Sequence, residues 1–429
     1  MAILAYAFNC SYEAYVAPRY EFMGMGFRKV DPQYVLMSWI YALVPGLFLP
    51  LNLQRPSQVF LYVQYFIFYV PFVFSAYHVT QPFVPHPAIF QLVSTIFLSM
   101  MLLVIGWTIP LRKYASFPTK PSSYWSIFLF LFLGFLTLLL ITYKDNLKLV
   151  NFDDVYELRE AAGEISNKSI LGSRFTAYAL TWVQGCLAPI AFAVAVFNRK
   201  WHLAVLSALP FLLIYMIQGS KVALIAPLFT IFFYFWATRL PKYAFVTFSL
   251  TLTGLLIVPY AISFFGYEEW NTPYLLLVNT RTFTIPQMVS VQFFDFFRTH
   301  TNTYGGHIPG VDLIFPYQFK QGLPYEIGWY YFDRPVGANV GIWAGDGIAS
   351  FGLIGIPLFT LFLIAFFRVI DSLTSHLKTS FVIVSMAYLA SIFANVQINV
   401  VIGTNGLFLS ILFLMFMPKR GTGRALHRS

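Results

Sequence analysis

The sequence predicts an all-α fold, namely a polytopic integral membrane protein with about eleven transmembrane helices. The first observation is the composition. Of the 429 residues, 58% are hydrophobic and only 10% are charged, whereas about a quarter of a soluble domain is charged. The second observation is a series of uncharged runs of about 20 residues, each long enough to cross a hydrocarbon core about 30 Å thick. Residues 1–429 are therefore expected to form a single transmembrane domain.

The expected spans follow one another along the chain, with two long interruptions. The clearest are "IFQLVSTIFLSMMLLVIGWTI" and "YWSIFLFLFLGFLTLLLIT". The first span contains Pro45 and Pro50, which membrane helices tolerate when neighbours satisfy the freed carbonyl groups. The expected set, about eleven spans and roughly ten to twelve, is 34–52, 57–78, 88–109, 123–142, 175–197, 201–218, 221–238, 242–265, 347–367, 380–396 and 400–417.

Lysine and arginine gather in alternate connections between these spans. Basic residues occur in 110–122, 198–202 and 239–242, whereas 79–87 and 397–399 have none. The positive-inside rule therefore places the basic connections in the cytoplasm. This topology also accounts for the formal net charge of +10, and no long basic run indicates a nucleic-acid partner.

The same alternation places two enlarged segments on the periplasmic side. They are a first loop at 143–174 and a second, larger loop at 266–346. The N-terminal residues 1–33 conflict with this scheme, because they also fall outside yet contain three basic residues. Either one N-terminal span is missed, or residues 1–18 form a membrane-embedded piece.

The first loop is the most polar part of the chain. Its "DDVYELREAA" stretch predicts a short surface helix with acidic residues in the first turn. Arg174 stands where this loop becomes apolar. Its side chain is expected either to snorkel to the interface or to bind an anion, and both interpretations stay open.

The second loop combines aromatic and arginine side chains. Residues 286–298 predict a helix with proline in its first turn. Its phenylalanines fall on one side, with Gln287, Asp295 and Arg298 on another, so we expect an amphipathic helix in the outer headgroup region. The tryptophans of the loop suit an aromatic belt. Together with arginines, which fork onto two phosphate oxygens, they also suit sugars and phosphates.

Polar groups near membrane depth are further candidates. Lys221 begins a span directly after a Gln-Gly turn, and Asp346 lies at the expected outer end of another. Ionisable residues in such places are functional by default, although Lys221 can also snorkel outward. The sequence contains no Walker loop, H-E-x-x-H motif or dinucleotide glycine fingerprint. We therefore expect no nucleotide cofactor and no metal, and a substrate that is already activated.

Three stretches resemble a known family. "NTRTFTIPQMVSVQFFDFF" is similar to a segment with an arginine, an apolar-Pro step and an aromatic-Asp-Phe-Phe element. "GANVGIWAGDGIASFGLIGI" resembles a stretch that re-enters the membrane, and "QGSKVALIAP" the start of a middle span, where relatives more often have arginine than Lys221. The family is that of the Wzy-type O-antigen polymerases, which join oligosaccharide repeat units.

This resemblance implies glycosyl transfer on the periplasmic face of the bacterial inner membrane. The growing chain, linked through pyrophosphate to undecaprenol, would move onto a new lipid-linked repeat unit. Lipid-linked oligosaccharide would thus be both donor and acceptor, and membrane lipids, a chain-length regulator and a flippase would be partners. No cofactor is implied, because the lipid pyrophosphate is the leaving group.

The transfer needs cations where charge builds on the pyrophosphate, and a base near the acceptor hydroxyl. The candidate catalytic residues are Arg281, Arg174, Asp346, Asp295 and His300, and the candidate substrate-binding residues are Arg298, Arg334, Lys221, His307, Trp343 and Tyr304.

Other classes of membrane protein compete with this interpretation. A flippase or transporter would distribute charge along a central cavity between two related halves, and the chain shows no internal repeat. An O-antigen ligase or another membrane glycan enzyme would share the leaving group and hence the arginines. A structural protein without catalysis does not explain the aromatic and arginine-rich second loop.

Overall fold

The structure of the protein is a computed structural model built of helices. The structure describes residues 1–110, 117, 119–150, 155–167, 173–334 and 336–418. Over these residues all regular elements are helical, and no strand occurs. Eight segments in this part of the chain are long and apolar enough to cross a membrane, which is consistent with a polytopic membrane protein.

The eight segments agree with eight of the expected spans, and several combine short helices of different pitch. They are Gln58–His78 (α4 Gln58–Val63, η3 Gln64–Tyr69, α5 Val70–Ser75, η4 Ala76–His78), His86–Thr108 (α6), Pro121–Asn146 (α7 Pro121–Tyr143, η5 Lys144–Asn146), Phe175–Phe197 (within α9 Ser173–Trp182, then η6 Val183–Leu187 and α10 Ala188–Phe197), Trp201–Gln218 (α11), Lys221–Arg239 (α12), Pro241–Phe264 (η7 Pro241–Tyr243, α13 Ala244–Phe264) and Trp343–Leu373 (η9 Trp343–Ile348, α17 Ala349–Phe351, η10 Gly352–Ile354, α18 Gly355–Leu373).

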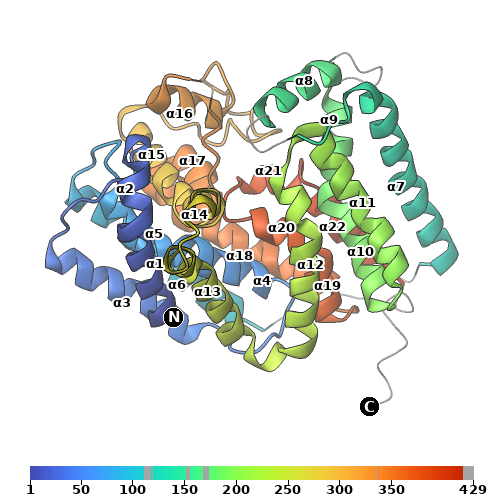
Figure 1. Ribbon diagram of the computed structural model, residues 1–429, viewed down its shortest axis with the longest axis horizontal. Helices are drawn as coiled ribbons and strands as arrows, with labels where there is room; N and C mark the ends of the chain where they lie inside the picture. Colours follow the sequence, from blue (N-terminus) through green and yellow to red (C-terminus); the bar gives the residue numbers. More distant parts are fainter. Residues whose placement is uncertain (111–116, 118, 151–154, 168–172, 335, 419–429) are drawn as a thin grey trace.

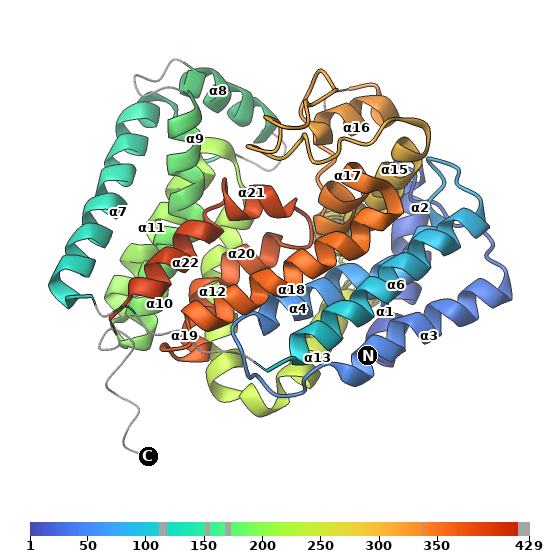
Figure 2. The same ribbon diagram turned by 180° about the vertical axis from the view of Figure 1, so that it is seen from behind.

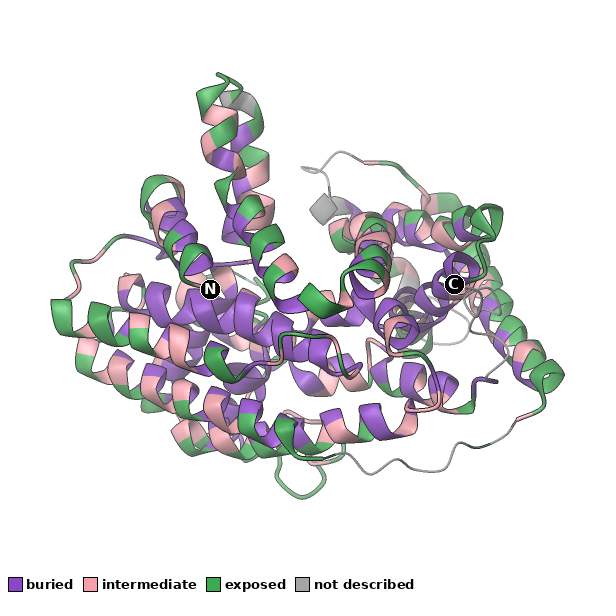
Figure 3. Cartoon of the chain, turned by 90° about the horizontal axis from the view of Figure 1, so that it is seen from below, coloured by how far each residue is buried: buried purple, intermediate pink, exposed green. Residues whose placement is uncertain are grey.

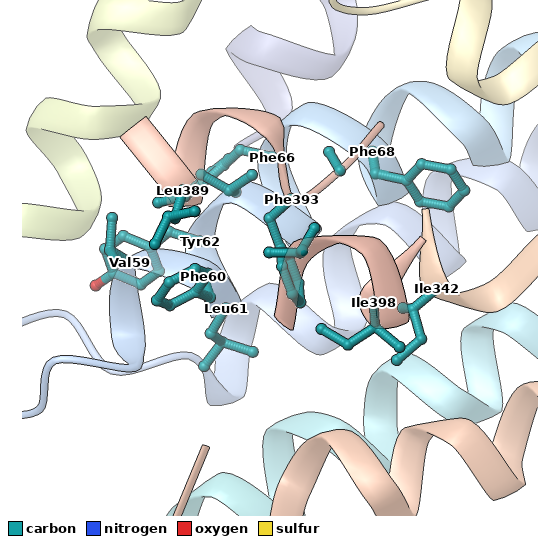
Figure 4. Packing of buried hydrophobic residues seen from close by; sticks show 14 of the residues in the cluster. Val59, Phe60, Leu61, Tyr62, Phe66, Phe68, Ile342, Leu389, Phe393 and Ile398 are labelled. Carbon is teal, nitrogen blue, oxygen red and sulfur yellow. The ribbon is translucent and has the colours of Figure 1, made fainter. Parts of the chain in front are cut away.

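The helices form two groups that meet along a buried centre (Figures 1 and 2). One group contains α4–α6, α13 and α18, and the other contains α7 and α9–α12. Phe60 of α4 packs edge-on to Phe393, with ring centroids 5.2 Å apart, and Figure 4 shows these rings among other buried side chains. The buried residues concentrate at this centre, while exposed ones mark the outer helices (Figure 3). The core therefore lies between the two groups.

The N-terminal residues form a helical hairpin beside this core. Its first arm comprises α1 (Ala2–Ser11), η1 (Tyr12–Val16), α2 (Ala17–Tyr20) and η2 (Glu21–Met23), and its second arm is α3 (Pro32–Phe48). The first arm packs against α13, where the Tyr15 and Tyr260 rings lie 4.8 Å apart. Such packing against a membrane-spanning helix fits both an embedded piece and a missed span, so both interpretations of residues 1–18 stay open.

Three expected spans differ from the structure. The first, 34–52, is the 17-residue α3, which ends at Phe48. The span 380–396 is divided into α19 (Thr379–Ser385) and α20 (Ala387–Ile392). The span 400–417 is divided into α21 (Ile398–Ile402) and α22 (Leu407–Phe416).

The break between α21 and α22 has a local cause. Gly406 adopts a left-handed φ of 82°, which continues no right-handed helix. The indole of Trp182 donates a 3.1 Å hydrogen bond to the backbone carbonyl of Gly403. The hydroxyl of Thr181 donates a 2.6 Å hydrogen bond to the backbone carbonyl of Thr404. Irregular backbone at membrane depth is stable where protein supplies such partners, and this tertiary effect is invisible to hydropathy.

The basic turns 198–202 and 239–242 lie at the same end of the molecule, the lower end in Figure 1, which we call the basic face. The amide of Leu53 donates to the carbonyl of Pro241 at 2.7 Å. The guanidinium of Arg368 donates to the carbonyl of Pro110 at 2.8 Å. The first contact joins two connections, and the second joins α18 to the segment that follows α6. The helices α8 (Val155–Asn167), α15 (Ile285–Thr299) and α16 (Leu323–Phe332) lie at the opposite end, which we call the upper face.

Candidate functional site at the upper face

The predicted helix at 286–298 is present as α15, preceded by α14 (Glu268–Leu275) and η8 (Leu276–Thr280). Eleven of its 15 residues are buried. Even Gln287 is enclosed, and its amide donates to the carbonyl of Ile67 in η3 at 3.0 Å. The expectation of a helix resting on the headgroups is therefore wrong, because η3, α16 and η9 cover it on several sides. Its phenylalanines pack against protein.

Charged side chains emerge only at the last turn of α15. Asp295 is half-buried, and its Oδ2 accepts a 2.9 Å hydrogen bond from the Tyr331 hydroxyl of α16. Its Oδ1 lies 4.0 Å from Nη1 of Arg298, whose side chain is 44% exposed. Burial, and then the adjacent Asp295 carboxylate, raise the pKa of Tyr331. The phenol therefore remains a donor, and it holds the carboxylate beside the guanidinium.

Arg298 borders a small cavity between α15 and η10. The cavity holds about 340 Å³, and most of its lining is apolar. Arg298 is its charged member, and Gln91 from α6 adds an amide. The guanidinium carbon also lies 5.6 Å from the centre of the Phe294 ring. The remaining lining residues are Phe297, Ile348, Phe351, Gly352, Leu353 and Ile354.

His300 follows α15 directly and lies flat on Phe296, with ring centroids 3.9 Å apart. Its Nδ1 is 3.0 Å from the carbonyl of Phe296. The same Nδ1 is 3.0 Å from the Thr299 hydroxyl, which can donate to it, so these contacts fit either tautomer. The imidazole also meets the ring of Tyr330 edge-on, with centroids 5.3 Å apart, and these contacts fix its position.

His307 occupies a different environment under the same loop. The hydroxyl of Thr303 donates to the carbonyl of Ala349 at 2.9 Å, so Nδ1 of His307 donates to that hydroxyl at 2.7 Å. Burial, partly offset by the Gly345 backbone, lowers the pKa of His307 to about 4. Such an imidazole is neutral at pH 7 and a weak base, which makes it poorly suited to general-base catalysis.

Asp346 and Trp343 lie inside the core. Asp346 is fully buried, and its Oδ2 accepts a 2.8 Å bond from the amide of Ile398, at the start of α21. Trp343 is also fully buried, and its indole donates to the hydroxyl of Thr360 at 2.8 Å. Neither side chain can touch a substrate at the surface, because the exposed area of each is zero.

The other predicted residues come from several different elements. Arg281 is exposed and precedes α15, so roughly 20 Å of helix separates it from Arg298. Lys221 opens α12 in the other group of helices, next to Ser220, which caps that helix. Exposed Tyr304 packs its ring 6.3 Å from Phe351, and Arg334 is exposed after α16. Arg174 begins α9, but its side chain lies outside the described residues.

Sequence reasoning missed two members of this site. Tyr331 was one of many tyrosines in the second loop, and Gln91 belongs to a transmembrane span far away in sequence. The tertiary contacts bring both to α15, and no local pattern singles them out. Among the described residues, no three His, Cys, Asp or Glu side chains are grouped so that they could hold a metal ion.

Comparisons with known proteins add no relative. No family model, curated protein or solved structure matches this chain.

Proposed function

We propose that the protein polymerises lipid-pyrophosphate-linked oligosaccharide repeat units by glycosyl transfer at the upper face. The observation that carries the proposal is the Arg298 cavity, where a half-exposed guanidinium stands beside a paired carboxylate and above an apolar floor. A pyrophosphate lipid presents the same combination, since it has an anion next to a hydrocarbon chain. The resemblance of the α15 segment to the Wzy-type polymerases points to the same reaction.

In this proposal Arg298 stabilises the negative charge that builds on the departing pyrophosphate. Asp295, whose Oδ1 lies 4.0 Å from the guanidinium, receives the proton that the acceptor hydroxyl loses when its oxygen attacks the sugar. Tyr331 is a positioning residue, because its hydrogen bond fixes the other carboxylate oxygen.

Arg298 replaces Arg281 as the first choice for the leaving group. A pyrophosphate is far shorter than the roughly 20 Å of helix between the two arginines, so they cannot grip one pyrophosphate together. Arg298 has a carboxylate beside it and borders a cavity.

The test is complementation of a strain lacking the gene, with surface polysaccharide separated on a gel. We expect Arg298→Ala to lower the polymerisation rate about 100-fold, as loss of a donor to a developing oxyanion does. The gel would then show core bearing a single repeat unit in place of a ladder. Asp295→Asn should give the same pattern.

The matched control is Arg239→Ala, which removes an exposed arginine from the end of α12 on the basic face and should leave the ladder intact. An intact ladder with Arg298→Ala, at normal protein level, would exclude the proposed site. Loss of every repeat unit in the deletion strain would indicate a flippase or a ligase and overturn the polymerase.

A further inference from the structure

A long groove lies on the opposite flank of the molecule from the Arg298 cavity. It separates α7 from α10 and α11 and has a volume of about 570 Å³. On α7 it reaches from Trp125 to Leu140, which corresponds to roughly 22 Å along the helix. The rest of the lining comes from α10, α11 and the turn between them, and most of it is aliphatic or aromatic.

The packing of α7 leaves this groove open. Near the basic face, Phe128 contacts Phe413 of α22, with ring centroids 5.3 Å apart. Nearer the upper face, Phe135 contacts Trp182 of α9 at 6.0 Å. The helix is thus held on one side, and it forms the outer edge of the molecule in Figures 1 and 2. On the other side, toward α10 and α11, hydrocarbon must fill the space, since water gains few hydrogen bonds from such a lining.

The polar members of the lining are unevenly placed. Ser207 lies part of the way along the groove, whereas Asn198 and Lys200 form the turn between α10 and α11 on the basic face. Lys200 is exposed, and Arg199 precedes it in the same turn. No acidic side chain belongs to the lining. One mouth of the groove is therefore cationic, and the rest suits a hydrocarbon chain.

We propose that this groove binds an anionic glycerophospholipid, with its phosphate at Lys200 and one acyl chain between α7 and α11. Basic pockets between membrane helices on the cytoplasmic side recognise anionic headgroups in this way. The site uses none of the residues of the Arg298 cavity and is independent of the polymerase proposal. The lipid supports α7 where no helix packs against it.

Trp125 supplies a direct probe, because it lines the mouth of the groove. The full-length protein is placed in phosphatidylcholine nanodiscs that contain a small fraction of brominated phosphatidylglycerol or brominated phosphatidylcholine. The signal of Trp125 is the difference in fluorescence quenching between wild type and Trp125→Phe. We expect brominated phosphatidylglycerol to quench Trp125 at lower mole fraction than brominated phosphatidylcholine.

Two variants separate the headgroup from the acyl chain. Lys200→Ala should weaken the preference for phosphatidylglycerol about fivefold, since one basic residue near the surface contributes about that factor, and Lys200→Arg should restore it. Ser207→Phe should reduce quenching by both lipids, because it fills the groove. The matched controls are Lys242→Ala, another lysine on the basic face, and Thr251→Phe, an exposed position on α13, and both should behave like wild type.

Equal quenching by the two brominated lipids would overturn the proposal and show annular lipid only. Displacement by undecaprenyl phosphate that is insensitive to Lys200→Ala would also overturn it, and would assign the groove to the carrier lipid.

Discussion

Replacement of His307 by glutamine is expected to remove one pH-dependent component of stability. The imidazole is held under the loop that follows α15, where Nδ1 donates to the Thr303 hydroxyl. Its Nε2 is buried and has no hydrogen-bond partner among the described residues. Burial lowers the pKa of His307 to about 4, from an ordinary value of 6.5. The folded protein therefore resists protonation at a site that the unfolded chain protonates readily.

The sign and size follow from proton linkage. Above pH 6.5 neither state binds the proton, and the histidine contributes its full stability. As the pH falls from 6.5 to about 4, only the unfolded state gains the proton. The free energy of unfolding therefore becomes smaller as the pH falls. The difference between the two pKa values corresponds to a total loss of about 3 kcal/mol in the free energy of unfolding once the pH is below both values. About 2 kcal/mol of this loss is reached by pH 5.

The assay is chemical unfolding of detergent-solubilised protein between pH 8 and pH 5. His307→Gln loses the bond to Thr303 at every pH, which gives a constant offset. The difference in the free energy of unfolding between wild type and variant should become about 2 kcal/mol smaller from pH 8 to pH 5. His202→Gln, at the exposed start of α11, is the control and should follow wild type. A difference between wild type and His307→Gln that stays constant with pH would refute the reasoning.

Three further predictions concern packing and positioning. Gly185→Ala should destabilise the protein by about 1–3 kcal/mol through overpacking, because a Cβ at this position would collide with the carbonyl oxygen of Asn405; thermal unfolding measures this, and an unchanged midpoint would contradict it. Tyr331→Phe should lower kcat with little effect on KM, since it frees the Asp295 carboxylate without removing a substrate contact; an effect on KM alone would indicate a binding role. Trp343→Ala should cost about 3–5 kcal/mol of stability, and weakened sugar binding at an unchanged unfolding midpoint would restore its predicted role.

Local sequence signals are strong where the chain meets lipid or begins a helix. Hydropathy predicts the eight long segments, because each must be apolar over its whole length to cross hydrocarbon. Proline and periodicity predict α15 to within one residue at each end, Ile285–Thr299 against 286–298. The same signals mislead at 400–417, where an apolar run is divided by a turn whose carbonyl groups bond to Trp182 and Thr181.

For the candidate functional side chains, too, local sequence signals predicted one part and tertiary packing decided the other. Residue type made Asp295, Arg298 and Asp346 equal candidates, because a carboxylate or guanidinium in an apolar chain is costly wherever it lies. The structure leaves the first two at the surface beside a cavity and encloses the third beneath α21. Exposure is a property of what packs over a residue, and those neighbours are distant in sequence.

The sequence by itself determined that the chain is helical, which segments are long and apolar enough to span a bilayer, and which connections are basic, since length, hydropathy and charge are local properties. Only the tertiary structure decided that α15 is enclosed, that Tyr331 and Gln91 join Arg298, and that α7 stands apart from α10 and α11 across an open groove. The reason is that burial, pairing and cavities arise between helices, whose contacts depend on how the segments pack in three dimensions.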